Sequence, residues 1–140
     1  MTDPTDDPTP VFVADLAALT PQQWVDDVGV ATVHATDEIG FAVQVVPPGR
    51  QLAAHHHTDR WDHFVALRGT ATLHLTTRAG SGTAHRLGRG GFLAVPPGVT
   101  HRVDNTDGSE PFAYLLAQAP YRPDDFHHDE PGDGQSGEST

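Results

Sequence analysis

The chain has 140 residues, which is enough for one folded domain, and a formal net charge of -11 at pH 7. Nine of the 19 acidic residues lie in residues 1–10 and 124–140, so the remaining ten face all eight arginines in residues 11–123, a net charge of -2 there. This balance argues against a nucleic-acid surface, and the absence of cysteine and lysine excludes disulfides, thiolate ligands, Schiff-base chemistry and lysine-containing phosphate loops.

Both ends of the chain are predicted to be disordered. Residues 1–10 contain three prolines and three aspartates, and residues 124–140 consist mainly of Gly, Ser, Asp and Glu. Low hydrophobicity combined with like charge does not offset the entropy lost on ordering. The adjacent His127 and His128 are interpreted as solvated tail residues rather than as metal ligands. A single domain over residues 11–123 remains.

Within that domain only Asp15–Val28 resembles a helix, and Pro21 interrupts it, so one short helix or turn is the most that we expect. The rest alternates apolar and polar residues between frequent proline and glycine breaks, which is typical of short strands. The predicted strands are Val30–His34, Phe41–Val46, Gln51–His57, Trp61–Leu67, Ala71–Thr77, Thr83–Leu87, Phe92–Val95, Thr100–Val103 and Pro111–Ala117. This spacing predicts an all-β sandwich or barrel.

Histidine is frequent, with ten residues, and the spacing of three of them points to a metal site. Side chains of a strand alternate between faces, so His55 and His57 point the same way, about 6–7 Å apart along the strand. Two imidazoles in this arrangement converge on one metal ion. Asp62, at the start of the next strand, adds a carboxylate oxygen, and His101 supplies a third imidazole.

Two spaced sets of residues resemble the two sequence motifs of the cupin superfamily. The first set consists of Gly49, His55, His57, Asp62 and Gly69. The second consists of Gly90, Pro96, Gly98, His101 and Asn105. The resemblance extends over about residues 30–117 and implies a small double-stranded antiparallel β-barrel, jelly-roll-like, with the site at its centre.

The resemblance also implies one divalent metal ion per chain (Fe, Mn, Ni, Co or Zn), held by His55, His57, Asp62 and His101. Cupins normally have Glu where this chain has Asp62, and Asp is shorter by about 1.5 Å. Three outcomes therefore stay open: Asp62 is a ligand, directly or through water; the adjacent His63 replaces it; or neither binds. Alternation places His63 on the opposite face unless a bulge intervenes.

Three residues are substrate-side candidates because their strands line the barrel in such proteins: Gln44, Phe64 and Tyr114. Gln44 and Tyr114 are equally well explained as hydrogen-bonded structural groups. Phe64 shares its strand face with Asp62 and gives the wall beside the metal an apolar lining. The other isolated histidines, His34, His74 and His85, are interpreted as surface residues.

The leading hypothesis is a divalent-metal-dependent enzyme that acts on a small oxygenated or carbonyl-bearing molecule, as a dioxygenase, decarboxylase, isomerase, lyase, dehydratase or cyclase. The alternatives are a non-catalytic module that binds a small molecule or metal, and a metal-free acid–base catalyst. We expect a homodimer that binds neither nucleic acid nor membranes. With no apolar leader or membrane segment we expect a cytoplasmic protein, and the all-arginine basic set suggests bacterial secondary metabolism.

Overall fold

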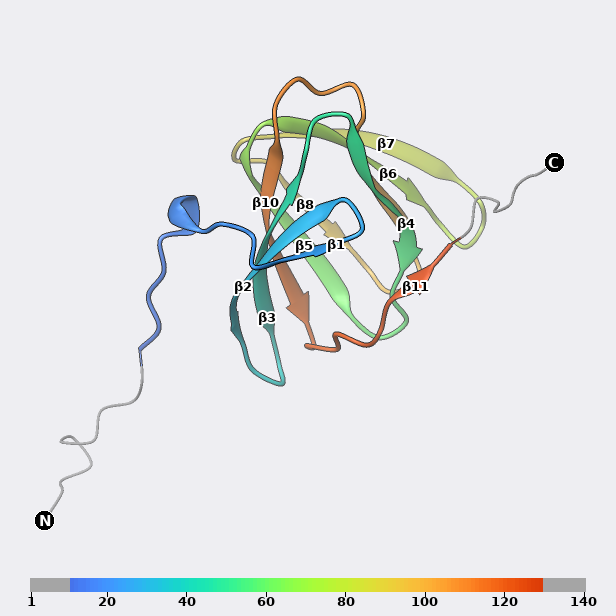
Figure 1. Ribbon diagram of the computed structural model, residues 1–140. Helices are drawn as coiled ribbons and strands as arrows, with labels where there is room; N and C mark the ends of the chain where they lie inside the picture. Colours follow the sequence, from blue (N-terminus) through green and yellow to red (C-terminus); the bar gives the residue numbers. More distant parts are fainter. Residues whose placement is uncertain (1–10, 130–140) are drawn as a thin grey trace, which may run out of the picture.

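The computed structural model describes residues 11–129, whose strands form two antiparallel sheets (Figure 1). The six-stranded sheet has the order β1 (Gln23–Val25), β2 (Val28–Ala35), β3 (Gly40–Val46), β10 (Phe112–Ala119), β5 (Trp61–Arg68) and β8 (Phe92–Val95). The five-stranded sheet has the order β11 (His127–His128), β4 (Arg50–His56), β9 (Thr100–Asn105), β6 (Thr70–Thr76) and β7 (Gly82–Gly88). The predicted all-β fold is confirmed.

All nine predicted strands are present, with ends that differ from the prediction by at most two residues. Successive strands along the chain often lie in different sheets: β3 and β5 belong to one sheet, and β4 between them belongs to the other. The short connection between β4 and β5 therefore crosses from one sheet to the other, and it contains His57 of the predicted site.

The core lies between the sheets and is built from the apolar side chains that alternation turns inward. Val46 and Phe112 of one sheet and Leu73 and Val103 of the other are each fully buried. Tyr114 is equally buried, and its ring lies 5.0 Å from that of Phe64. Burial of one large apolar or aromatic side chain of this kind stabilises the folded state by about 1.5–3 kcal/mol.

The segment predicted as one short helix or turn contains more than that. A single 3₁₀ turn, Leu16–Ala18, is followed by β1, which pairs with β2 and was not predicted. The connection between β1 and β2 uses Asp26 at a positive φ of 55°, a conformation that Asp tolerates better than most residues. Among residues 11–129 no helix has the length and apolar character needed to span a membrane.

The prediction of disorder from residue 124 onward is wrong for residues 124–129. There β11 pairs with β4, with His127 opposite His56 and His128 opposite His55 (Figure 1). The prediction fails because it rests on the average composition of residues 124–140, whereas a few of these residues make the specific contacts described below. The other expected disordered residues, 1–10 and 130–140, lie outside the described part of the chain.

Candidate metal centre

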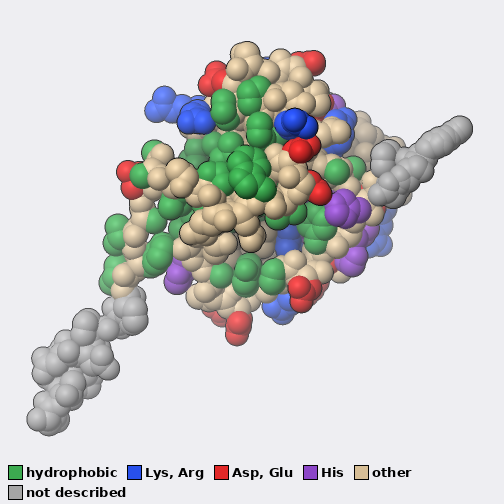
Figure 2. All heavy atoms as spheres, in the orientation of Figure 1, with side chains coloured by type: hydrophobic (Ala, Val, Ile, Leu, Met, Phe, Trp, Pro, Cys, Tyr) green, Lys and Arg blue, Asp and Glu red, His purple; other side chains and the backbone are tan. Residues whose placement is uncertain are grey.

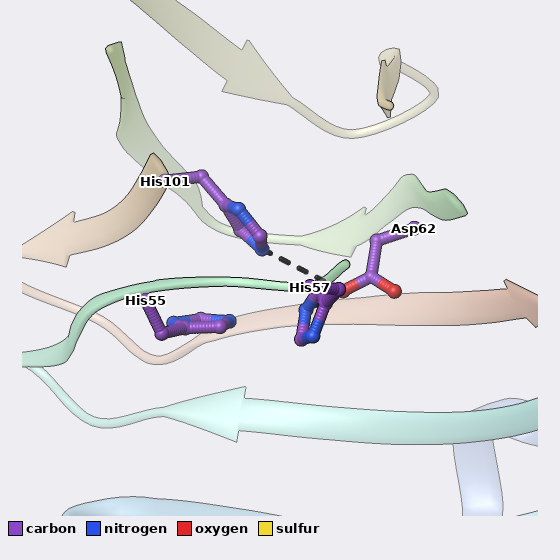
Figure 3. Close-up of side chains that lie close together, drawn as sticks. All are labelled: His55, His57, Asp62 and His101. Carbon is purple, nitrogen blue, oxygen red and sulfur yellow. Dashed lines mark ion pairs between the residues drawn. The ribbon is translucent and has the colours of Figure 1, made fainter. Parts of the chain in front are cut away.

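Three histidines and one aspartate from both sheets meet in the interior of the barrel (Figure 3). His55 on β4, His57 just after β4 and His101 on β9 belong to one sheet, and Asp62 on β5 belongs to the other. One potential ligand atom from each lies within 4.8 Å of all the others. Each of the four residues is at most 2% exposed. The structure thus brings together all four residues that the sequence singled out.

Strand register accounts for the meeting of His55 and His101. The two residues are direct partners across the β4–β9 ladder, where the pairing shifts register between Leu52 and His55. Their ring centroids lie 4.2 Å apart. Alternation along the strand then places the His57 ring on the same side, 5.0 Å from that of His55.

Backbone carbonyl groups fix which nitrogen of each ring faces the centre. Nδ1 of His55 donates to the Ala53 carbonyl at 2.8 Å, Nδ1 of His101 donates to that of Val99 at 3.1 Å, and Nδ1 of His57 donates to that of Asp125. A carbonyl oxygen only accepts, so Nδ1 carries a proton, and in the neutral form of the ring Nε2 keeps its lone pair. This arrangement is typical of histidines that bind a metal.

At the centre of the group, polar atoms that carry lone pairs lie close together. Nε2 of His101 is buried and has no hydrogen-bond partner among the described residues. Oδ2 of Asp62 lies 2.9 Å from Nε2 of His57 and 3.6 Å from Nε2 of His101. Lone pairs at such distances repel unless a cation, a proton or a metal ion, lies between them.

The ionisation states also suit a metal. Burial, followed by the nearby His101, lowers the pKa of His55 from 6.5 to about 2, so this ring is neutral at neutral pH, as a ligand must be. Burial alone would raise the pKa of Asp62, but its contacts with His101 and His57 and the charge of Arg60 outweigh it and hold the pKa below its usual range.

The group therefore fits a divalent ion. Two ligands at about 2.1 Å from one ion are at most about 4.2 Å apart, so the observed spacing requires only a small contraction.

Arg60 is a member of this site that the sequence analysis did not identify. It is 4% exposed, and its Nε donates to Oδ1 of Asp62 at 3.0 Å. Its Nη2 lies 3.1 Å from Nε2 of His57, and its Nη1 donates to the Arg122 carbonyl at 2.9 Å. The signal was present in the sequence, since Arg60 stands two residues before Asp62 and alternation puts both on one face.

The segment 125–129, here called the C-terminal segment, covers the histidines. The Phe126 ring stacks on that of His55, with centroids 4.4 Å apart and planes at 16°. The Asp129 carboxylate accepts from Nδ1 of His56 at 2.9 Å and from the Thr100 hydroxyl at 2.8 Å. Figure 2 shows histidine side chains exposed beside β11, where the described chain ends. The side chains of His127 and His128 are about half exposed, in line with the prediction that they are solvated.

A cavity of about 370 Å³ lies beside the site. Its walls include His55, Arg60 and Asp62, and they are otherwise mainly apolar. The apolar part is lined by Val28, Val30, Leu52, Phe64, Leu116 and Phe126, among others. A cavity of this size and character suits a small organic molecule.

The substrate-side candidates separate into two kinds. Gln44 and Phe64 line the cavity, whereas Tyr114 does not. The Tyr114 hydroxyl donates to Oε1 of Gln44, and burial, followed by the charge of Asp62, raises the pKa of the phenol above its usual range. Tyr114 is thus a core residue that holds a wall residue in place.

The structure leaves His63 and the three predicted surface histidines outside the group of four. His63 points to the outer face, where its Nδ1 donates to the Ala117 carbonyl at 3.2 Å and its ring lies between those of Trp61 and Phe92. The three predicted surface histidines lie outside the group as expected, with His74 paired to Asp104, His85 bonded to Thr83 and His34 stacked on Phe12.

Comparison with known proteins gives relatives of several kinds. Oxidoreductase macE of Penicillium terrestre is 34% identical over 71 residues, which are 51% of this chain and 26% of that protein. A glucose-6-phosphate isomerase of Pyrococcus abyssi is 34% identical over 100 residues, which are 66% of this chain and 50% of that protein. The chain thus spans between a quarter and half of the length of these relatives.

One solved structure illustrates the likeness in fold. It is an uncharacterized protein with a double-stranded β-helix domain from Klebsiella pneumoniae, with a TM-score of 0.65 and 22% identity, covering 77% of this chain and 89% of that one. At the level of the family, residues 42–117, more than half of the chain, match the family model described as a cupin domain. With its fold, its two motifs and this match, the chain belongs to the cupin family.

Proposed function

We propose that the protein is a divalent-metal-dependent cupin enzyme that acts on a small oxygenated or carbonyl-bearing molecule. The observation that carries this proposal is the set of three inward-facing Nε2 lone pairs and one carboxylate oxygen beside an apolar cavity. His55, His57, Asp62 and His101 would hold one ion of Fe, Mn, Ni, Co or Zn. When bound, the ion would supply Lewis-acid or oxygen-activating chemistry.

The residues around the site have separable roles in this proposal. The backbone carbonyls of Ala53, Val99 and Asp125 orient the three rings, so little reorganisation accompanies metal binding. The apolar walls exclude water and hold the carbon skeleton of the substrate. Four protein ligands on a six-coordinate ion leave two positions for substrate or for substrate and dioxygen. One of the two relatives is named as an oxidoreductase and the other as an isomerase. We therefore propose a metal-dependent active site without assigning it one reaction type.

Metal analysis of the protein purified without added metal tests the proposal directly. We expect about one divalent ion per chain, lost in His57→Ala together with turnover, since this variant removes a central ligand. His74→Ala is the matched control, because His74 lies on the outer face and pairs with Asp104. A His57→Ala protein that lost its metal and retained full activity would contradict the proposal and favour acid–base chemistry without metal.

The second candidate is a module that binds a small molecule or metal without turnover, and it is favoured if the four ligands close a tetrahedral zinc site. Binding of azide to the cobalt-loaded protein, or of nitric oxide to the iron-loaded protein, separates the two. A changed metal spectrum means that the ion has an open position, as an enzyme needs. An unchanged spectrum favours the closed site.

We also propose that the protein is a homodimer. Support comes from a row of three rings on the outer face, in which the His63 ring lies 6.0 Å from that of Trp61 and 6.1 Å from that of Phe92. Trp61 is 43% exposed and Phe92 is 61% exposed. Phe92 is the first residue of β8, which is an edge strand of the six-stranded sheet among the described strands. A second copy of the chain would cover both this edge and the exposed rings. Light scattering should show a dimer that Phe92→Asp dissociates and the exposed control Val13→Asp does not. A monomeric wild type refutes this proposal.

A further inference from the structure

The charge balance of the cavity narrows the kind of molecule that it would take. Of the residues that line the cavity, the two with formally charged side chains, Arg60 and Asp62, are paired with each other. Both are nearly inaccessible to solvent, at 4% and 1% exposure. Without a metal the two charges cancel, and the described cavity walls carry no net charge apart from histidine.

Three of the five N–H donors of Arg60, one on each nitrogen, are engaged by three partners. They are Oδ1 of Asp62, the carbonyl of Arg122 and Nε2 of His57. The last of these atoms is the one that the proposed function assigns to the metal. A lone pair that binds a metal ion no longer accepts a hydrogen bond, so metal binding deprives Nη2 of Arg60 of its acceptor in a buried place. A buried charged donor without an acceptor is costly.

A divalent ion would also add two positive charges beside the neutral Arg60–Asp62 pair. The described cavity walls contain no second carboxylate to offset them. Buried charge that is not compensated by the protein favours a ligand that brings the opposite charge.

We infer that the metal-loaded site takes an anionic oxygen ligand, a carboxylate, enolate or phenolate on an otherwise apolar small molecule, and that Arg60 donates a hydrogen bond to it. This inference rests on the proposed function and narrows its substrate class. The apolar walls formed by Leu52, Phe64 and Leu116 would contact the remainder of the molecule. Arg60 thereby becomes a residue that determines specificity, in addition to pairing with Asp62.

A purely structural role for Arg60 makes a different prediction. If Arg60 only supports Asp62, its replacement lowers stability and metal affinity but changes the affinities for charged and uncharged ligands in the same proportion. A pair of probes with the same shape and different charge separates the two roles.

The experiment measures benzoate and benzamide binding by calorimetry and by the visible spectrum of the Co²⁺-loaded protein. We expect the Co²⁺-loaded wild type to bind benzoate at least about tenfold more tightly than benzamide, since charge-assisted hydrogen bonds are the stronger ones. The metal-free protein should bind benzoate at least about tenfold more weakly than the loaded one, because the divalent charge is then absent and Nη2 of Arg60 stays bonded to His57. Equal benzoate affinity with and without Co²⁺ overturns the inference.

Variants isolate the arginine from the metal, which itself favours an anion. With Co²⁺ saturating, Arg60→Met should lower benzoate affinity by about tenfold or more relative to benzamide affinity, and Arg60→Lys should fall between. Arg86→Met is the matched control, since Arg86 is exposed on β7. A folded, Co²⁺-loaded Arg60→Met protein with wild-type benzoate affinity overturns the inference. If Arg60→Met does not fold, Arg60→Lys decides, and wild-type benzoate affinity in that variant counts against the inference.

The failure of this inference and that of the proposed function give different results. A wild type that takes up no Co²⁺ overturns the proposed function. The inference then also loses its premise, because no metal displaces Nη2 of Arg60 from His57. A wild type that takes up Co²⁺ but binds benzoate and benzamide equally overturns only the anionic ligand.

Discussion

At the scale of single residues, the three histidine rings are oriented by different means. His55 and His101 each donate from Nδ1 to the carbonyl two residues earlier in the same chain segment, Ala53 and Val99. His57 instead donates to Asp125, which is 68 residues away in sequence. Two of the three ring orientations are thus local properties of their strands, and the third depends on the C-terminal segment.

Asp62 illustrates how a shorter carboxylate still takes part in the group. One oxygen accepts from Arg60, and the other faces Nε2 of His57 and of His101. Both carboxylate oxygens are therefore directed by neighbours, and Arg60 holds one in place while the other faces the centre. Of the alternatives, the geometry disfavours His63 as a ligand, since alternation places it on the outer face.

On the outer face, Asp104 gives a residue-scale prediction for pH. Burial opposes its ionisation, but hydrogen bonds from the side chain and backbone of Thr106 and from His74, with the charge of Arg102, lower its pKa from 3.8 to about 2. A carboxyl with a lower pKa in the folded than in the unfolded state stabilises the fold above the unfolded value, and this stabilisation is lost as the pH falls from about 4 through 2.

Asp104→Asn should therefore lower the free energy of unfolding by about 1 kcal/mol at pH 7, allowing for solvent screening, and by less at pH 2. Urea unfolding at several pH values measures the difference. Asp107→Asn, at an exposed position three residues further on, is the control and should change little at any pH. A constant difference between wild type and Asp104→Asn from pH 7 to 2 would contradict the assignment.

At the scale of elements, the C-terminal segment connects the end of the described chain to the metal centre. The Asp125 carboxylate accepts from the backbone N–H groups of Thr58 and Asp59, at 2.8 and 2.6 Å, and so anchors the segment to the β4–β5 connection. The same residue offers its carbonyl to His57. Removal of the Asp125 carboxylate should therefore weaken the orientation of the His57 ring.

Asp125→Ala should loosen the segment and lower metal affinity by several-fold, up to about tenfold, the lower end of what loss of a ligand's supporting partner typically costs. Hydrogen exchange of residues 124–129 and Co²⁺ titration measure the two effects. Asp124→Ala is the matched control, because the neighbouring Asp124 is exposed and its side chain makes no hydrogen bond among the described residues. If both variants bind Co²⁺ as the wild type does, the segment does not support the centre.

The sequence was most informative where a pattern is local. Alternation predicted nine strands, the common face of His55 and His57, and the outward direction of His63. It did not predict β11 or the carbonyl of Asp125 at His57, because these depend on a contact between distant segments, and the composition of residues 124–140 resembles a solvated tail. The same alternation rule places Arg60 on the face of Asp62, but arginine has only hydrogen-bond donors, so a search for metal ligands does not find it.

At the scale of the whole molecule, the four candidate ligands come from both sheets. His55 and His101 stand on β4 and β9 of the five-stranded sheet, and Asp62 stands on β5 of the six-stranded sheet. The sheets already share a core of fully buried side chains, among them Val46, Leu73 and Phe112. An ion held by all four residues would add a link between the sheets to this core, so metal binding and global stability should be coupled.

This coupling predicts that the melting temperature depends on the metal. An ion at a hundred times its Kd stabilises the folded state by about 2.7 kcal/mol, which for a domain of this size raises Tm by roughly 10 °C. Calorimetry with and without Co²⁺, followed by chelation, measures the increment. It should fall to a small fraction in Asp62→Ala, because the three histidines alone bind more weakly and no longer connect the two sheets.

The comparison uses the increment rather than Tm itself, because Asp62→Ala also leaves the buried Arg60 without its partner and lowers Tm in the absence of metal. Asp59→Ala is the control: Asp59 is exposed, pairs with Arg122 at 3.6 Å and should keep the full increment. An undiminished increment in Asp62→Ala would mean that the ion is held within one sheet by the histidines alone. In that case Asp62 would serve Arg60 rather than the metal.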